Sequence, residues 1–600
     1  MPNQLSSATP RPQLWAGLWL SARYQALTKP LLFLLAFPLF GYLAERLIAS
    51  AGRTVLSSGD GLSALLNWQG VLLLLLGTAL VVLTIATDIA AFIIMEGVRV
   101  QRGSYPSVRQ TLFAALRSMR RFLHPATWLL VAYVGLVVPL GGIGLSAGPL
   151  RDFKIPNFIT DVIYQSPLYL GLYSAALLLL ALLGFCLIFT FHFVLLAGHT
   201  PWRAMLSSAA FVRRHPWPAL KTLLGALAPI AAALLLVFAI TVLLQTLPAL
   251  ATSVAARRFW ALFTLMLGAQ LLALVLLLAG PYVLRRLTLF FLARHTQLPG
   301  VPVLPHDAKA PAPARVPRLL WLGAAATLAF NAAACAVATR FFDNLFIATH
   351  PIAIIAHRGG GNLGAENTLA GLEAAIAAGA AWSEIDVQRT ADGAYILNHD
   401  GDFQRLSGSR KTASQITLAQ ARALPVKDLF DPTRGDARIA TLEETLDAAK
   451  DRIGLFIELK GKTADKQMVD DVARLIKAKG MEKQAVILSL DYALIQYSEQ
   501  RYPELDSGFL YFFSLGNPAT LTGDYLVMEE GEATQRNIAS IRAAGKRVVV
   551  WTVNTKESIA RFTATDVDGI ITDYPLEVKA ALAARKDLSD WQLILEKLLD

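Results

Sequence analysis

Seven long apolar runs in the first 340 residues limit what this chain can fold into. A bilayer core about 30 Å thick is crossed by about 20 apolar residues in a helix, so a run of that length predicts one span. The sequence therefore predicts an α-helical multi-span membrane domain over residues 1–340, with about seven transmembrane helices near residues 31–48, 70–95, 126–147, 168–197, 223–247, 259–284 and 319–339.

The first run is the weakest of the seven because Pro38, Glu45 and Arg46 interrupt it. It could also be read as a secretory signal peptide with small residues at 49–51. The segment before it is long for that role, so we expect a span that is retained in the mature protein.

Charge divides the chain in two. Residues 1–340 hold 26 Lys and Arg against 7 Asp and Glu, whereas residues 341–600 hold 29 against 37. The excess of positive charge lies in short stretches between apolar runs, which is typical of membrane proteins and argues against a nucleic-acid partner. The abrupt change after Arg340 predicts a domain boundary.

The same positive residues predict the orientation, because Lys and Arg stay on the cytoplasmic side of a membrane. Alternate loops hold 19 and 7 of them, with the N-terminus on the richer side. We therefore expect a cytoplasmic N-terminus, a cytoplasmic Pro/Ala-rich linker at 296–317 and a last span at 319–339. Seven crossings then place residues 341–600 outside, whereas one miscounted span would reverse this.

From residue 352 onward, short β-branched or aliphatic runs alternate with helical patterns, as in parallel strands joined by crossover helices. Nine candidate strands and about 260 residues predict a (β/α)₈ barrel over residues 350–583, followed by a tail helix at 584–600. The turn at 390–393 is too short for a crossover helix. Strands 382–388 and 394–398 should therefore form an antiparallel hairpin that supplies the extra strand.

Polar residues gather where the predicted strands end, which is where a barrel builds its active site. Residues two apart on a strand share a face, so Glu384 and Asp386 point the same way, as do Glu458 and Lys460. If Asp392-Gly393 forms a two-residue turn, Asp386 lies opposite His399. His357-Arg358 ends the first strand.

Three carboxylates brought together favour a hard divalent cation such as Ca²⁺ or Mg²⁺, because without one they would repel each other or become protonated. Two histidines next to such a cation suit general acid and base catalysis. Arg358 would neutralise a phosphoryl oxygen. The predicted chemistry is metal-dependent phosphodiester hydrolysis.

At these residues the chain resembles the glycerophosphodiester phosphodiesterase family. The resemblance covers about residues 351–580, and the preceding spans look like the membrane domain of some bacterial members. Its motifs are His357-Arg358-Gly359, Glu366-Asn367-Thr368, Glu384-x-Asp386, Thr390-x-Asp392-Gly393, His399-Asp400, Glu458-x-Lys460, Trp551-Thr552-Val553-Asn554 and Ile571-Thr572-Asp573-Tyr574-Pro575.

The resemblance implies a TIM barrel of the phospholipase C-like phosphodiesterase type, in a bacterial cytoplasmic membrane. It further implies metal ligands at Glu384, Asp386 and Glu458, an acid/base pair at His357 and His399, and phosphate contacts from Arg358 and Lys460. The implied reaction converts a glycerophosphodiester into sn-glycerol 3-phosphate and an alcohol.

Some matched residues allow two interpretations. Glu366 and Asn367 would contact substrate or cap the first helix, and Trp551 would line the substrate site or pack in the core. Asp573 is compatible with an ion pair at the barrel rim. The aromatic run 509–513 would lie in the core or meet the bilayer or an acyl chain.

Two other functions stay open from the sequence. One is a lysophospholipase D or phospholipase-like hydrolase acting on membrane lipid. The other is a membrane transporter or sensor whose barrel only binds phosphate esters.

Overall fold

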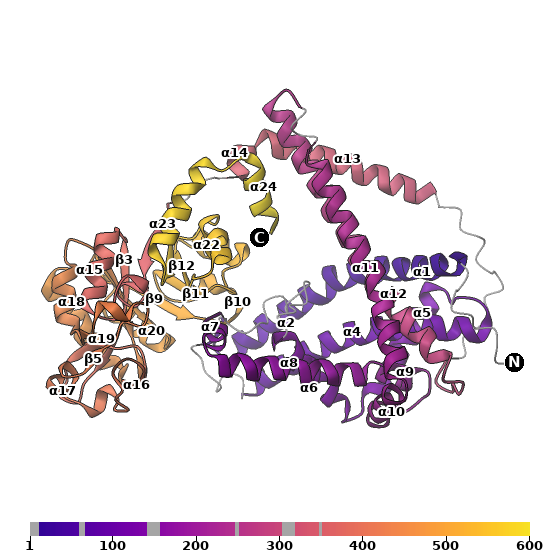
Figure 1. The fold of residues 1–600 in the computed structure, drawn as a ribbon, viewed down its shortest axis with the longest axis horizontal. Helices are drawn as coiled ribbons and strands as arrows, with labels where there is room; N and C mark the ends of the chain where they lie inside the picture. Colours follow the sequence, from indigo (N-terminus) through magenta and orange to yellow (C-terminus); the bar gives the residue numbers. More distant parts are fainter. Residues whose placement is uncertain are drawn as a thin grey trace. The chain divides into compact units, whose positions relative to one another are not determined.

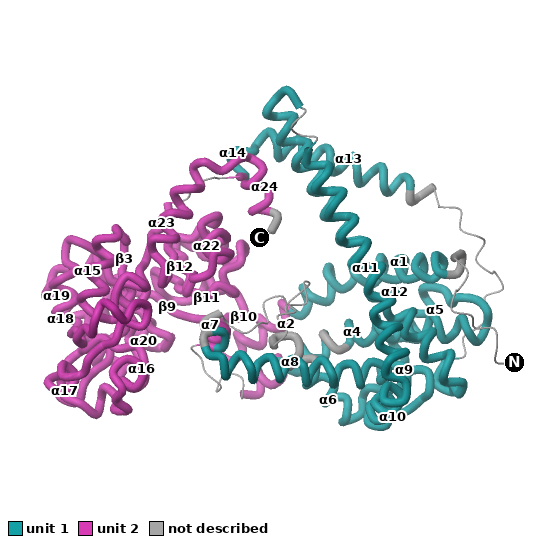
Figure 2. Tube along the Cα trace, viewed as in Figure 1, with its two compact units in different colours: residues 1–40, 74–154, 163–345 teal, residues 41–73, 155–162, 346–600 magenta. Residues whose placement is uncertain are grey.

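The computed structural model describes residues 11–53, 55–58, 67–140, 157–246, 251–302, 318–346 and 351–599. The chain forms two compact units, shown in different colours in Figure 2. Unit 1 contains residues 1–40, 74–154 and 163–345, and unit 2 contains residues 41–73, 155–162 and 346–600.

Long apolar helices dominate the first 340 residues (Figure 1). Among the described residues, six helices are long and apolar enough to cross a membrane: Leu14–Ser50, Trp68–Arg102, Pro167–Leu195, Pro216–Leu244, Val254–Leu292 and Trp321–Arg340. They comprise α1 (Arg11–Leu31), α2 (Phe37–Ser50), α4 (Trp68–Arg102), α8 (Pro167–Leu187), α9 (Thr190–Leu195), α11 (Pro216–Leu244), α12 (Val254–Leu292) and α13 (Arg318–Arg340).

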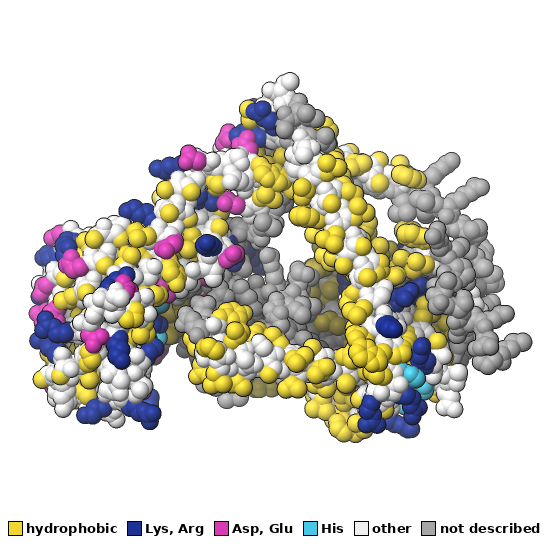
Figure 3. All heavy atoms as spheres, viewed as in Figure 1, with side chains coloured by type: hydrophobic (Ala, Val, Ile, Leu, Met, Phe, Trp, Pro, Cys, Tyr) yellow, Lys and Arg dark blue, Asp and Glu magenta, His cyan; other side chains and the backbone are white. Residues whose placement is uncertain are grey.

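The outward side chains of these helices are apolar, as expected for helices surrounded by lipid. Figure 3 shows hydrophobic side chains covering α8 and α11, while charged side chains gather over the barrel. The predicted run at 126–147 begins as α6 (Thr127–Leu140). The rest of that run lies outside the described residues, so its crossing stays a prediction. Between the spans lie α5 (Val108–Ser118), α7 (Asn157–Gln165) and α10 (Pro201–Arg214).

Buried charges in unit 1 are paired with one another. Glu96 on α4 accepts hydrogen bonds from Arg99 Nε at 2.7 Å and from Arg285 Nε on α12 at 3.0 Å. Tyr105 donates a third, at 2.7 Å. A buried carboxylate is tolerated when cations and donors satisfy it. This cluster therefore joins two apolar helices by polar contacts.

Unit 2 contains a closed barrel of eight parallel strands. Its order is β2-β13-β12-β11-β9-β8-β7-β3, and β2 pairs with β3 to close it. The strands are β2 (Ala353–Ala356), β3 (Trp382–Arg389), β7 (Gly454–Leu459), β8 (Ala485–Ser489), β9 (Asp506–Tyr511), β11 (Tyr525–Glu529), β12 (Arg547–Trp551) and β13 (Gly569–Thr572). The predicted fold is confirmed.

Helices surround the barrel, and most begin at a Thr or Asp whose side chain accepts a hydrogen bond from the first turn, as N-caps do. Thr368, Thr441 and Asp465 are examples. The helices are α15 (Leu369–Ala378), α18 (Leu442–Ala449), α19 (Lys466–Lys479), α20 (Tyr492–Arg501), α21 (Gln535–Ala543), α22 (Lys556–Thr563) and α23 (Pro575–Ala584), and α24 (Asp590–Leu599) follows.

Two strand connections differ from a simple strand–helix repeat. The segment between β4 (Tyr395–Leu397) and α18 carries α16 (Gln404–Ser407), α17 (Leu418–Arg422), β5 (Pro425–Val426) and β6 (Ala437–Arg438). The segment between β9 and β11 carries β10 (Ser514–Gly516) and a 3₁₀ turn, with no α-helix among its residues, all of which are described.

The predicted hairpin exists, but its predicted register is wrong. β3 and β4 pair antiparallel with Val387 opposite Leu397, so Asp386 lies level with Asn398 and not with His399. Thr390 closes a three-residue loop by hydrogen bonding with Ala394, and Gly393 adopts φ 84° within it. A three-residue loop accommodates a left-handed glycine, as a two-residue turn also does. The extra loop residue shifts the pairing of the two strands by one residue.

Candidate active site

Three carboxylates lie together at the ends of two neighbouring strands. Glu384 and Asp386 are on β3, and Glu458 on β7 pairs directly with Asp386 in the sheet register. Each residue is buried, and one oxygen of each lies within 4.8 Å of the others. The alternation of side chains along a strand places all three on the inner face of the barrel.

Asp386 is held from two sides. Asn367 donates from Nδ2 to Asp386 Oδ2 at 2.8 Å and accepts from the Asp386 backbone N–H at 3.0 Å. Lys460 Nζ lies 3.2 Å from Asp386 Oδ1 and 2.8 Å from Glu458 Oε2. Lys460 thus neutralises part of the negative charge and bridges the two strands.

Burial and the neighbouring charges shift the pKa values of Glu384 and Asp386 in opposite directions. Burial, helped by the nearby Asp386, raises the pKa of Glu384 to about 8. Burial also raises the pKa of Asp386, but Lys460, His399 and Arg358 outweigh it and hold that pKa low. Buried carboxylates that cannot all ionise together are in need of a cation.

The donor set fits a hard divalent cation. Glu458 Oε1 is buried and has no hydrogen-bond partner among the described residues. An acceptor left unsatisfied in a polar cluster has a physical use if a metal ion takes it. Carboxylate oxygens are the ligands that Ca²⁺ and Mg²⁺ prefer, so Glu384, Asp386 and Glu458 are suited to hold one.

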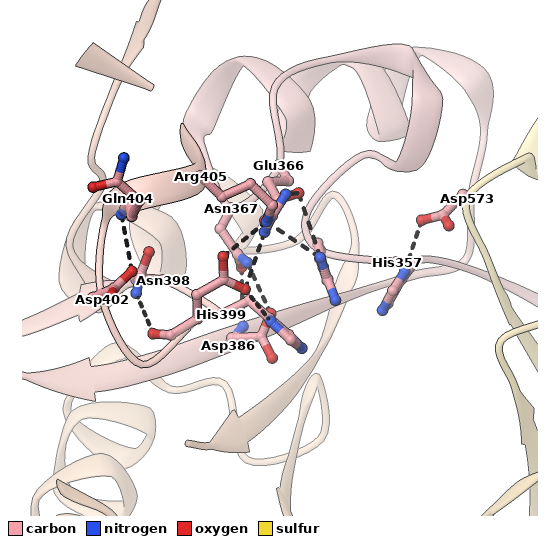
Figure 4. A network of polar contacts seen from close by, with 12 residues as sticks. His357, Glu366, Asn367, Asp386, Asn398, His399, Asp402, Gln404, Arg405 and Asp573 are labelled. Atoms are coloured by element: carbon pink, nitrogen blue, oxygen red, sulfur yellow. Dashed lines mark hydrogen bonds and ion pairs between the residues drawn. The ribbon is translucent and has the colours of Figure 1, made fainter. Parts of the chain in front are cut away.

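His357 is oriented by an aspartate from the last strand. It follows β2, and its Nδ1 lies 2.7 Å from Asp573 Oδ1 just after β13 (Figure 4). Asn554 fixes Asp573 by donating to Oδ2 at 2.6 Å. His357 Nε2 lies 4.0 Å from Glu384 Oε2. Burial lowers the pKa of His357, but the charge and hydrogen bond of Asp573, together with the charge of Glu384, outweigh it and the net shift is upward.

His399 is oriented in the same way on the other side of the cluster. Its Nδ1 lies 2.9 Å from Asp400 Oδ1. Arg405 donates from Nε to Asp400 Oδ2 at 2.8 Å and from Nη1 to Glu366 Oε2 at 2.8 Å (Figure 4). Both histidines therefore have Nδ1 engaged by a carboxylate, which leaves Nε2 for chemistry.

Arg358 brings an unused donor to the site. Its Nη1 lies 3.4 Å from both oxygens of Glu366, while its Nε is buried without a hydrogen-bond partner among the described residues. A guanidinium binds phosphate oxygens well because its donors lie in one plane. The side chain is thus suited to an anion close to the carboxylate cluster.

Comparison with known families agrees with this geometry. Two family models match the chain. Residues 357–577 match the family model described as "Glycerophosphoryl diester phosphodiesterase family". Residues 17–306 match the family model described as "Membrane domain of glycerophosphoryl diester phosphodiesterase". The chain belongs to the glycerophosphoryl diester phosphodiesterase family. It is a phosphoric diester hydrolase with a membrane domain.

Relatives of the phosphodiesterase share its catalytic part. A glycerophosphodiester phosphodiesterase of Caldanaerobacter subterraneus is 29% identical over 235 residues, which cover 37% of this chain and 94% of the relative. A solved glycerophosphodiester phosphodiesterase of Thermotoga maritima is 26% identical with a TM-score of 0.32, covering 39% of this chain and 99% of that one. An Oleispira antarctica phosphodiesterase, solved with the product sn-glycerol-3-phosphate, is 23% identical with a TM-score of 0.36, covering 38% and 96%.

The phosphodiesterase brings most of the residues predicted from its sequence to one place. His357, Arg358, His399 and Lys460 surround the cluster of Glu384, Asp386 and Glu458. Asn367 joins it as a partner of Asp386, and Glu366 links Arg358 to Arg405. The alternative that Glu366 or Asn367 caps the first helix is wrong, because Thr368 caps α15. Trp551 ends β12, is half-buried and donates from Nε1 to the Val527 carbonyl at 3.2 Å.

Four residues next to the two histidines had no predicted role in catalysis, although three of them stand in the motifs quoted from the sequence. The ion pair considered for Asp573 is confirmed, with His357 as its partner. Asp573 and Asn554 orient His357, and Asp400 and Arg405 orient His399. The sequence signal for three of them was their position shortly after a strand or beside a histidine. Arg405 lies in an irregular insertion, where no strand period points to it.

Proposed function

We propose that the enzyme hydrolyses glycerophosphodiesters to sn-glycerol 3-phosphate and an alcohol, and that it depends on a divalent cation, Ca²⁺ or Mg²⁺. The observation that carries this proposal is the cluster of three buried carboxylates with an unpartnered Glu458 oxygen. It lies beside two histidines that are both oriented through Nδ1.

Each side chain has a task in the proposed reaction. A cation at Glu384, Asp386 and Glu458 supplies positive charge against the phosphoryl oxygens. His357 and His399 divide the proton transfers through their Nε2 atoms, and Arg358 holds phosphate. Lys460 is assigned to phosphate as well, with its contacts to Asp386 and Glu458 keeping it in place. Water adds across one P–O bond: its oxygen becomes bonded to phosphorus, and a proton passes to the leaving alcohol.

We further propose that the N-terminus is cytoplasmic and that the barrel lies on the extracytoplasmic side of a bacterial cytoplasmic membrane. The distribution of Lys and Arg supports this orientation. A second support comes from β1 (Val55–Ser57), which lies between the first two spans and pairs with β10 of the barrel unit. The pairing requires both to be on one side of the membrane. A crossing at α6 would give an odd number of spans before the barrel, which agrees with this pairing.

The proposed activity is tested with the purified full chain and glycerophosphocholine. Conversion of glycerophosphocholine to sn-glycerol 3-phosphate is followed by phosphorus NMR, for the wild type and for His399→Ala. We expect at least a 100-fold loss in the variant, as is usual when an acid or base is removed. The matched control is His124→Ala, which replaces an exposed histidine of the membrane domain.

The same pair of variants tests the transporter or sensor alternative. A transporter would still take up glycerophosphocholine into proteoliposomes after His399→Ala, whereas we expect no uptake that is independent of hydrolysis. Absence of turnover in the wild type with either cation would refute the proposed activity.

A further inference from the structure

The catalytic end of the barrel carries an apolar rim. Within residues 351–597, whose side chains are all described, five large apolar side chains are exposed: Leu429, Phe430, Phe512, Phe513 and Leu576. Their exposed fractions lie between 38% and 51%. Exposed apolar patches on otherwise polar proteins mark surfaces that contact a partner or a membrane.

All five residues of the apolar rim lie at the end of the barrel where the parallel strands finish. Phe512 and Phe513 directly follow β9, and Leu576 is in the first turn of α23 after β13. Leu429 and Phe430 belong to the insertion that follows β4, and the Phe430 ring meets Tyr574 at 6.2 Å. Tyr574 is next to Asp573, the partner of His357. The rim residues therefore lie at the same end of the barrel as the site.

Strand β1, which lies between the first two candidate spans, pairs with a strand next to this rim. β1 pairs antiparallel with β10, with Val55 opposite Gly516 and Ser57 opposite Ser514. The contact continues beyond the strands, because Ser58 N–H donates to the Phe513 carbonyl at 3.0 Å. Phe512 N–H in turn donates to Ser58 Oγ at 3.1 Å.

Strand β1 is buried. All three residues of β1 are buried, and Val55 joins the apolar cluster of Phe509 and Tyr511 on the barrel. The first part of the aromatic run 509–513 is thus core, while its last two residues are exposed. Strand pairing together with apolar burial makes this a specific attachment.

Chain length limits how far this attachment lies from the bilayer. Ser50 ends the first candidate span, and Val55 begins β1 five residues later. Five residues span at most about 17 Å when fully extended. Because β10 follows Phe512 and Phe513 directly, this part of the rim lies within reach of the membrane surface.

We infer that the apolar rim docks the catalytic entrance on the lipid bilayer, so that the enzyme takes phosphodiesters presented at the lipid surface, such as lysophospholipids. The substrate part of this inference rests on the proposed hydrolytic function. The reaction has the same balance: water oxygen goes to phosphorus, the bond to the head-group oxygen breaks, and that oxygen receives a proton.

Docking is tested by fluorescence quenching on the full chain in phosphatidylglycerol/phosphatidylcholine vesicles that contain spin-labelled lipid. Cys186 and Cys335 are first replaced by Ala. A bimane label is then placed on Phe513→Cys or, as the control, on Lys483→Cys, an exposed residue before β8 at the opposite end of the barrel. We expect at least threefold stronger quenching at position 513. Equal quenching at both positions would overturn docking.

The substrate class is tested by the paired variants Phe512→Ser/Phe513→Ser and Phe512→Leu/Phe513→Leu. We expect the serine pair to lose at least tenfold in turnover of vesicle-borne lysophosphatidylcholine and to keep wild-type turnover of soluble glycerophosphocholine. The leucine pair should keep both. Equal lysolipid rates for the serine pair and the wild type would overturn the inference.

The outcomes separate the two proposals. A wild type that cleaves glycerophosphocholine and not lysophosphatidylcholine refutes the lipid-borne substrate and leaves the proposed function intact. A wild type that cleaves neither refutes the proposed function, and the quenching measurement still decides whether the rim docks.

Discussion

Two buried glutamates, one in each half of the molecule, show how a structural charge differs from a functional one. Glu96 in the membrane domain is 3% exposed, and Arg285, Arg99 and Tyr105 satisfy both of its oxygens. Glu458 in the barrel is 4% exposed, and only one of its oxygens has a partner, Lys460, among the described residues. A carboxylate whose two oxygens are both paired can hold helices together. A carboxylate that has an oxygen without a partner and lies among like charges is suited to bind a cation.

The largest effect is expected for Glu458→Gln. The change removes a proposed metal ligand, so we expect turnover of glycerophosphocholine to fall at least about 10³-fold, within the range of several kcal/mol assigned to metal catalysis. The change also relieves repulsion among the carboxylates. The melting temperature in EDTA should therefore stay the same or rise, and a fall in it together with full activity would contradict the assignment.

Asp573→Asn should cost about 10²-fold in kcat/KM, because His357 loses its orienting carboxylate. Asp573 raises the pKa of His357 against burial. Its removal lowers that pKa, so the limb of the pH profile that reports His357 should move to lower pH. The stability that the Asp573–His357 pair provides is present below the unfolded pKa of histidine and is lost as pH rises through the folded one. Asp436→Asn, at an exposed loop position, is the control.

Arg405→Ala should have a smaller effect, about tenfold in kcat/KM, because Arg405 acts on His399 only through Asp400. Lysine at this position would keep the charge but lose the fork that reaches Asp400 and Glu366 together, so Arg405→Lys should recover little. Arg410→Ala in the same insertion is the matched control. An unchanged pH profile and rate in Arg405→Ala would show that the network does not position His399.

Glu96→Gln should change turnover per folded molecule least of all. Removing one partner of a buried ion pair costs about 3–5 kcal/mol, so the thermal stability of the membrane domain in detergent should fall clearly. Activity normalised to folded protein should stay within about twofold of the wild type, the scatter expected for a distant and independent site. A turnover loss like that of Glu458→Gln would erase the distinction between the two glutamates.

The regular parts of the fold were predictable because strands and amphipathic helices have periods that the sequence displays. Glu384, Asp386 and Glu458 could be placed together from strand alternation and from the rule that active sites lie at strand ends. Spacing also predicted the hairpin that adds β4 outside the barrel.

Contacts that depend on loop geometry or distant pairing were not predictable. The three-residue loop at Gly393 moved the register by one, and His399 reached the site through a segment beyond β4. Arg405 lies in an irregular insertion, where no strand or helix period predicts its contacts. The pairing of β1 with β10 joins residues more than 450 positions apart. A three-residue strand has too little pattern to reveal its partner.

The most direct test of the metal site is a titration of metal-free full-length protein with Ca²⁺ and with Mg²⁺, while glycerophosphocholine hydrolysis and bound metal are measured together. We predict no turnover after treatment with EDTA, and recovery in proportion to one bound cation per chain. Glu458→Gln should show neither recovery nor stoichiometric binding. Full turnover in protein shown to be free of metal would contradict the assignment of Glu384, Asp386 and Glu458 as a cation site.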